Sequence, residues 1–228
     1  MKRFLCWVLL GLIVASPALA VPSVVVSRTP GTYPVAPLSG EFTLIPNAEL
    51  QVITGGGPSF QSFCIEAHES VTVGNTYDVA VNNKAILGDG LRPGELPAPG
   101  GGDLLSPESA YLYTEFRGGT LAGYDYTPGG GREGSALSLQ TAFWYLEGEV
   151  GYQDIGALSP QAQAFIAAAQ ASGWTTIGGV RVLNLFAGTT GKEIYQDMLT
   201  MTVPVPGGML LGAIGACLIG WLRRRRTL

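Results

Sequence analysis

The sequence predicts an α+β fold in which a β-sandwich or barrel-like core carries a helical insertion. Strand patterns occur on both sides of a region, residues 106–173, that contains three helical patterns. No internal repeat is visible in the chain. This order predicts one domain over residues 21–202, preceded by a signal peptide at 1–20 and followed by a sorting and membrane segment at 203–228.

The first part of the domain, residues 21–57, favours strands and turns. A valine run lies between Ser23 and Arg28, and an alternating stretch runs from Gly40 to Ile45. Prolines separate the two stretches. We therefore expect this region to be entirely β-structure.

Further strands are expected on both sides of the helical region. The alternating sequence FQSFCIE predicts a strand that includes Cys64, and residues 76–86 predict another. Residues 87–103, rich in glycine and proline, predict a loop. Residues 177–186 and 192–203 return to strand composition.

Two helices of the insertion have clear start signals. Ser106 is a good cap residue because proline and an acidic residue follow it, and this helix should end at Gly118. Ser159 is likewise followed by proline, which predicts a helix that runs to Gly173.

The helix expected between them, Gly134 to Glu149, carries an unusual polar residue. Its apolar positions recur at helical spacing, and Gln140 lies on the same stripe. A buried amide is costly unless it is hydrogen-bonded. Either nearby backbone or a partner elsewhere in the chain must therefore receive Gln140.

The amino-terminal segment has the order of a secretory signal peptide. Lys2 and Arg3 precede an apolar run, and Ala18 and Ala20 form an A-x-A cleavage site. Twelve apolar residues are too few to span a bilayer. The mature chain should therefore begin at Val21, outside the cytoplasm.

The carboxy-terminal segment predicts a short membrane helix. An apolar run from Met209 to Leu222 is followed by four arginines, which should remain on the cytoplasmic side. Fourteen residues at about 1.5 Å each fall short of a hydrocarbon core of about 30 Å. The span is therefore marginal, and it would hold the domain outside.

Charge and cysteine content restrict the function of the exported domain. It contains seven of the thirteen basic residues and all seventeen acidic ones, a formal net charge of −10. Nucleic acid is therefore not an expected partner. Cys6 and Cys217 belong to the two terminal segments, which leaves Cys64 without a disulfide partner inside the domain. A lone thiol outside the cytoplasm must be buried, paired between chains or chemically committed.

Two short motifs resemble those of bacterial surface thioester domains. FCIE around Cys64 and LQTAFW around Gln140 are similar to the cysteine and TQxA-type motifs of that family, although Leu139 stands where threonine is common. The resemblance implies an intramolecular thioester between Cys64 and Gln140, and covalent coupling to amines on a surface or matrix ligand. Sulfur would attack the carboxamide and displace ammonia, in a site from which water is excluded. Six aromatic residues are candidates to shield the bond or to form ordinary core: Phe63, Tyr111, Tyr113, Phe143, Trp144 and Tyr145.

The tail resembles the PEP-CTERM sorting signal of Gram-negative bacteria. Its motif is Val203, Pro204, Val205 and Pro206, with Val205 in place of the usual glutamate, and the cluster is Arg223, Arg224, Arg225 and Arg226. The resemblance implies an exosortase-like partner, and a location in the cell envelope or outside the cell after processing.

Two other functions remain open for the same chain. One is a noncovalent structural or adhesive matrix protein, and the other is a cysteine hydrolase that uses Cys64 and His68. The hydrolase pairing is disfavoured because the two residues share a face only in a helix, whereas this stretch predicts a strand followed by a turn. No turnover chemistry, metal or cofactor is expected. Glu66, Glu69, Asp125, Glu147 and Glu149 show no calcium-loop spacing and are expected on the solvated surface.

Export can be tested directly. Fused to a reporter, residues 1–20 should direct it out of the cytoplasm, and replacement of Leu9 and Leu10 with aspartate should keep it inside by interrupting the apolar run. Fractionation of the reporter measures the outcome. Undiminished export of the aspartate variant would contradict the signal-peptide assignment.

Overall fold

The computed structural model describes residues 20–28, 34–36, 39–86, 101–187 and 193–203. The predicted signal peptide and sorting segment lie outside the described residues, apart from Ala20 and Val203 at their inner ends. Within the described ranges, every helix is too short or too polar to cross a membrane.

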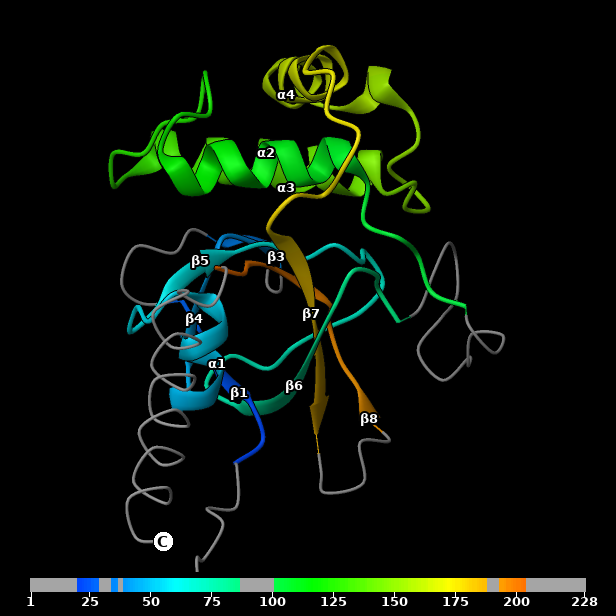
Figure 1. The fold of residues 1–228 in the computed structure, drawn as a ribbon. Coiled ribbons are helices and arrows are strands. Elements are labelled where there is room, and N and C mark those ends of the chain that lie inside the picture. The colour runs from blue at the N-terminus through cyan, green and yellow to red at the C-terminus, as the bar shows by residue number, and fades with distance from the viewer. Residues whose placement is uncertain (1–19, 29–33, 37–38, 87–100, 188–192, 204–228) are drawn as a thin grey trace, which may run out of the picture.

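A single antiparallel sheet of seven strands forms the core of the molecule (Figure 1). Its order is β5-β4-β1-β6-β7, and the second edge of β7 pairs with both β8 and β9. The strands are β1 (Ser23–Ser27), β4 (Phe42–Pro46), β5 (Phe60–Ser62), β6 (Thr76–Asn82), β7 (Val180–Ala187), β8 (Glu193–Ile194) and β9 (Met198–Met201). A separate pair is formed by β2 (Pro34–Ala36) and β3 (Ser39–Gly40).

The sheet curls into a barrel that nearly closes just after β5. There the chain meets β9 through an isolated bridge between Cys64 and Met198. The hydrogen bonds of this bridge are made by its flanking residues: Ile65 N–H donates to Asp197 O and Leu199 N–H donates to Phe63 O, each at 3.0 Å. The α+β class and the barrel-like core are confirmed, although Cys64, which was predicted to lie within a strand, is two residues beyond the end of β5.

Three helices lie together over one end of the barrel (Figure 1). They are α2 (Pro107–Gly118), α3 (Gly130–Leu146) and α4 (Pro160–Ala171), with a short 3-10 helix, η1 (Ile155–Ala157), before α4. As predicted, Ser106 and Ser159 cap α2 and α4, and their side chains accept hydrogen bonds from the backbone N–H groups of Ser109 and Ala162.

A fourth helix, α1 (Ala48–Thr54), contradicts the expectation that residues 21–57 are entirely β-structure. The Asn47 side chain caps it by accepting from Leu50 N–H. Gly55 ends it at φ +100°, a left-handed conformation that favours glycine. These two local signals outweigh the β-type composition of the surrounding sequence.

The boundaries expected for the central helix were also wrong. α3 begins at Gly130, four residues before the predicted start, and ends at Leu146. Its first turn is held by tertiary packing rather than by helix propensity: a Cβ on Gly131 would lie 2.1 Å from Asp125 Oδ2. Ser135 is a buried interior residue of α3, and its hydroxyl accepts from Asp125 N–H.

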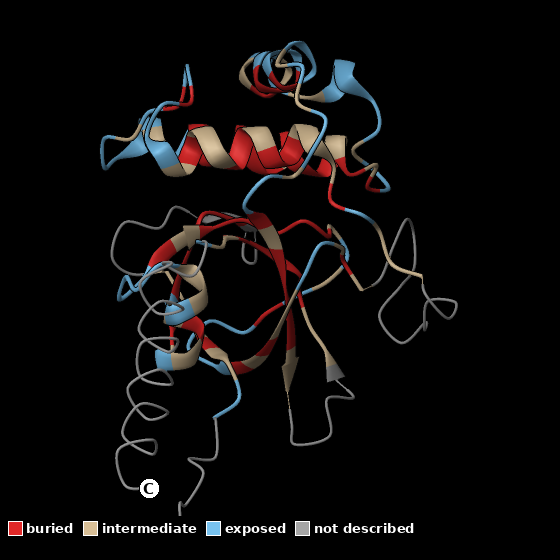
Figure 2. Ribbon diagram, in the orientation of Figure 1, coloured by how far each residue is buried: buried red, intermediate tan, exposed pale blue. Residues whose placement is uncertain are grey.

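Two apolar cores lie on either side of the sheet wall. Helix α3 is buried along much of its length (Figure 2). Phe63 and Ile65 belong to the core beneath the helices, whereas Cys64 belongs to the core inside the barrel. This alternation is expected of an extended segment, whose successive side chains point to opposite faces. Trp144 of α3 also belongs to the barrel core.

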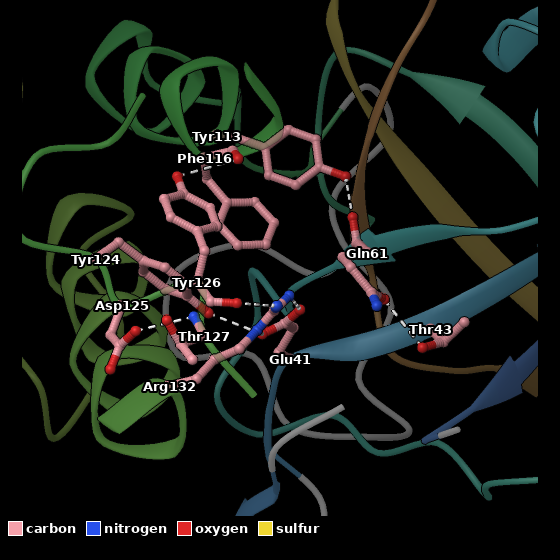
Figure 3. Close-up of polar contacts among 10 residues, drawn as sticks. All are labelled: Glu41, Thr43, Gln61, Tyr113, Phe116, Tyr124, Asp125, Tyr126, Thr127 and Arg132. Atoms are coloured by element: carbon pink, nitrogen blue, oxygen red, sulfur yellow. Dashed lines mark hydrogen bonds and ion pairs between the residues drawn. The ribbon is translucent and has the colours of Figure 1, made fainter. Parts of the chain in front are cut away.

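A buried ion pair fixes the first turn of α3 against β4 (Figure 3). Arg132 bonds both carboxylate oxygens of Glu41, at 2.5 Å from Nη2 and 3.0 Å from Nε, and it also donates to Tyr126 O. Tyr124 Oη donates to Glu41 Oε2 at 2.8 Å. Because Glu41 is fully buried, these donors compensate a charge that would otherwise be costly.

Replacing Arg132 with methionine should destabilise the domain by about 3–5 kcal/mol, because it leaves the Glu41 charge buried with one neutral donor. Urea unfolding followed by circular dichroism measures this change. Arg181→Met is the control, because among the described residues Arg181 bonds only backbone carbonyls, and it should change stability by about 1 kcal/mol or less. Equal effects of the two substitutions would contradict the role given to the ion pair.

Candidate functional site

The structure brings Gln140 and Cys64 together at the closure of the barrel. Gln140 Oε1 accepts from Cys64 N–H at 3.1 Å, and Gln140 Nε2 donates to Cys64 O at 2.7 Å. Both residues are buried, with 0% and 1% of their surfaces exposed. The amide therefore lies against the peptide groups on both sides of the cysteine α-carbon.

The barrel closure explains why this position needs an amide. In an antiparallel pair that is bridged only by its flanking residues, the N–H and C=O of the central residue point away from the partner strand. Cys64 is such a residue opposite Met198. Gln140 supplies one acceptor and one donor in the place of a neighbouring strand, so both buried peptide groups are paired.

The Cys64 thiol is free, and its environment keeps it protonated. Burial raises its pKa far above the ordinary value, and the charge of Glu69 raises it further. The nearby Arg28 guanidinium opposes this shift. Arg28 also lies over the Phe42 ring, with its Cζ 4.3 Å from the centroid. Desolvation outweighs the attraction of the single cation, so the thiol is neutral at physiological pH.

Four carboxyl groups, named here the carboxyl cluster, hold the chain beyond Cys64: Glu66, Glu69, Glu149 and Asp197. Glu149 Oε2 accepts from Ala67 N–H and Glu69 Oε2 accepts from Asp197 N–H, each at 2.9 Å. The cluster therefore ties the segment after Cys64 to β9 and to the end of α3.

Burial raises the pKa of three acids of the cluster, and repulsion by neighbouring carboxylates adds to the shift of Glu66 and Glu69. The pKa of Glu66 is raised strongly, first by burial and then by the charge of Glu149. Burial raises the pKa of Glu69 to about 8 and that of Asp197 to about 7. The expectation that Glu66, Glu69 and Glu149 lie on the solvated surface was wrong, because all three are buried or half-buried.

Glu147 was also expected on the surface and is instead buried at the end of α3. Ser106 Oγ donates to Glu147 Oε1 at 2.6 Å, which joins the start of α2 to the end of α3. Burial raises the pKa of Glu147 to about 7, although its bonds to serine lower it. Asp125 is exposed, as expected.

The aromatic residues considered as shields divide into two groups. Phe63, Tyr113 and Phe143 are fully buried beneath the helices, and the Phe63 and Phe143 ring centroids are 5.4 Å apart. Tyr111 and Tyr145 are half-buried at the margin of the same core. Trp144 belongs to the barrel core together with Cys64, and its ring centroid lies 4.5 Å from that of Tyr152.

The other sequence-predicted features are not assembled into this site. His68 is exposed and makes no hydrogen bond with Cys64 in the described part of the chain. Among the described residues, no group of three or more potential ligands is arranged to hold a metal ion. The cleavage residue Ala18 and the sorting residues beyond Val203 lie outside the described residues.

Sequence reasoning missed Arg28 and the carboxyl cluster. Arg28 ends a valine run far from either motif, and only the pairing of β1 with β4 places it beside the barrel core. The acidic residues give no sequence signal of burial, because their partners are backbone groups from β9 and from the chain after Cys64.

Comparison with known proteins gives limited additional information. No family model matches the chain, and no curated protein matches it. Among solved structures, the chain is similar to the "N-terminal thioester domain of surface protein from Clostridium perfringens", with a TM-score of 0.46 and 11% identity. The alignment covers 81% of this chain and 100% of that one. At this level of similarity, the roles of Cys64 and Gln140 have to be inferred from their own geometry.

The carboxyl cluster should make the domain less stable as pH rises. Folded-state pKa values of about 7 for Asp197 and about 8 for Glu69 exceed the unfolded values of about 4. Between pH of about 4 and about 8, the folded state therefore binds more protons than the unfolded state. Each extra bound proton should cost about 1.4 kcal/mol of stability per pH unit in this window. Urea unfolding at pH 5.5, 7 and 8.5 measures the trend.

Glu66→Gln should raise stability at pH 8.5 more than at pH 5.5, because it removes an ionisable member of the cluster and retains a hydrogen-bond donor. Glu133→Gln, at an exposed position of α3, is the matched control and should leave the pH dependence unchanged. A stability curve that rises from pH 5.5 to 8.5 in the wild-type protein would contradict this account.

Proposed function

We propose that this chain is an exported surface- or matrix-associated protein that forms an intramolecular thioester between Cys64 and Gln140. Through that bond it would attach covalently to amines, such as lysine side chains, on an extracellular ligand. The observation that supports the proposal is the double hydrogen bond between the Gln140 amide and the Cys64 backbone. It holds an acyl donor next to the only cysteine of the exported domain.

The same hydrogen bonds suit the chemistry of thioester formation. Sγ attacks Gln140 Cδ, the thiol proton passes to Nε2, and ammonia leaves as the C–N bond breaks. Cys64 N–H already bonds Oε1, where negative charge would develop, and Cys64 O already holds the leaving nitrogen. Because the Cys64 thiol and the Gln140 amide are held next to each other, the thiol can react without being ionised beforehand.

Burial would protect the product. A thioester in contact with water hydrolyses, whereas Cys64 and Gln140 are both buried where α3 meets the barrel. Attack by an amine would re-form an amide at Gln140 and return the proton to sulfur. Each molecule would react once, so the chain is proposed to be self-modifying rather than an enzyme with turnover.

One observation favours a second candidate, a noncovalent structural or adhesive protein. The Gln140 amide already pairs both buried peptide groups of Cys64, which gives it a sufficient structural role in the unreacted protein. The two candidates share the fold and differ only in whether the Cys64–Gln140 bond forms.

Sorting is a separate part of the proposal and rests on the terminal sequences. The signal peptide and the Val203–Pro206 motif with its arginine cluster support export, an exosortase-like partner and an envelope or extracellular location. Attachment to the membrane through the tail would be transient if the tail is processed.

Intact mass decides between the two candidates. The full chain should be lighter than its sequence, after allowance for signal-peptide removal, by about 17 Da, the mass of the displaced ammonia. Methylamine, which adds about 31 Da, should turn this deficit into an excess of about 14 Da and leave a methylamide on Gln140, which peptide mapping locates.

Cys64→Ala and Gln140→Ala should each lack the mass loss. Cys217→Ser and Gln163→Ala are the matched controls and should retain it, because Cys217 belongs to the predicted tail and the Gln163 amide bonds Leu158 O. A wild-type mass equal to that of the unmodified sequence would exclude the thioester and leave the structural candidate.

A further inference from the structure

Trp144 lies about one helical turn beyond Gln140 on α3. It follows Gln140 by four residues, which places both on one face, and helical side chains lean toward the amino terminus. The indole therefore covers the turn that carries Gln140. Trp144 also belongs to the same apolar core as Cys64 and Met198, inside the barrel.

The indole N–H of Trp144 is an unpaired buried donor. Only 6% of the residue is exposed, and Nε1 finds no acceptor among the described residues. An indole nitrogen can only donate. Most buried side-chain polar atoms in native proteins are paired, so an unpaired one calls for an explanation, and a role in reaction is one such explanation. The Gln140 oxygen accepts from Cys64 N–H and keeps a second lone pair, which makes no hydrogen bond with Trp144 in the unreacted protein.

We propose that Trp144 Nε1–H donates a hydrogen bond to the carbonyl oxygen of Gln140 as the thioester forms and as an amine cleaves it. This inference rests on the proposed function. When Sγ adds to Cδ, the π electrons of the C=O bond move to oxygen, and the anion needs donors in a site without water. Cys64 N–H supplies one donor, and Trp144 supplies the second. Collapse of the adduct expels ammonia in formation, or the sulfur in aminolysis.

The test removes the N–H and keeps the shape of the ring. Benzothienylalanine, in which sulfur replaces the indole nitrogen, is incorporated at position 144 of the full chain. Intact mass gives the fraction of protein in the thioester form and its rate of reaction with methylamine. Loss of one such donor should slow thioester formation, aminolysis or both by about 100-fold or more.

The same replacement at Trp174 is the matched control. Trp174 is half-buried and packs against Tyr111, with ring centroids 5.8 Å apart, away from the barrel core. This variant should form and lose the thioester at wild-type rates. Trp144→Phe, with Trp174→Phe as its control, repeats the comparison with natural residues.

Folding and reactivity are measured separately, by near-UV circular dichroism and thermal unfolding. A structural role alone predicts a lowered unfolding temperature with unchanged rates, and that result would overturn the inference while leaving the proposed thioester intact. A wild-type chain without the mass loss would instead overturn both. Slowed chemistry in a folded Trp144 variant, with normal rates in the Trp174 variant, supports the donor role.

Discussion

The hydrogen bonds between the Gln140 amide and the Cys64 backbone are the constraint around which the rest of the fold is arranged. They occupy the place where a barrel strand would otherwise pair, and unpaired peptide groups there would each cost about 1–3 kcal/mol. A side chain can fill that place only if its helix is fixed both in rotation about its own axis and in its distance from the barrel. The first turn of α3 is held by the Glu41–Arg132 ion pair, and its end is held by Glu147. Gln140 lies between these two anchors.

The same contact has two thermodynamic consequences. As long as the amide is intact, its two hydrogen bonds stabilise the fold by about 0.5–1.5 kcal/mol each. Conversion to a thioester would forfeit the Nε2 bond to Cys64 O and the resonance of the amide. The escape of ammonia compensates for these losses. Dilution of the released ammonia to about 1 μM favours thioester formation by roughly 8 kcal/mol relative to a 1 M standard state. Formation is thus compatible with a folded protein that supplies orientation and lets the product leave.

Local sequence signals predicted those parts of the molecule that depend on local physics. Ser106 and Ser159 cap the helices they were expected to cap, and the inward position of Gln140 follows from helical spacing alone. Features set by tertiary contacts were missed. α3 extends through Gly130 and Gly131 because Arg132 and Asp125 pack there, whatever the low helix propensity of glycine.

The residues of the candidate site also fall into two groups, those recognisable from the sequence and those defined by tertiary contacts. Cys64 and Gln140 are recognisable because each is chemically odd in its own setting: a cysteine without an intradomain partner and an amide on an apolar stripe. Arg28 and Glu149 are ordinary in sequence and acquire significance only from their neighbours. A carboxylate becomes buried when a backbone N–H such as that of Ala67 is available to it, and no pattern in the sequence encodes that availability.

The electrostatics around Cys64 bear on which chemistry the site favours. A cysteine hydrolase needs a thiolate at neutral pH, usually beside a histidine, and a lowered thiol pKa. Here burial raises the pKa of Cys64, Glu69 raises it further, Arg28 compensates only in part, and the single histidine of the chain is exposed. A neutral thiol resists oxidation outside the cytoplasm, because the thiolate is the reactive form. Such a thiol reacts only with a partner held against it, which favours a single reaction with Gln140 over repeated attack on diffusing substrates.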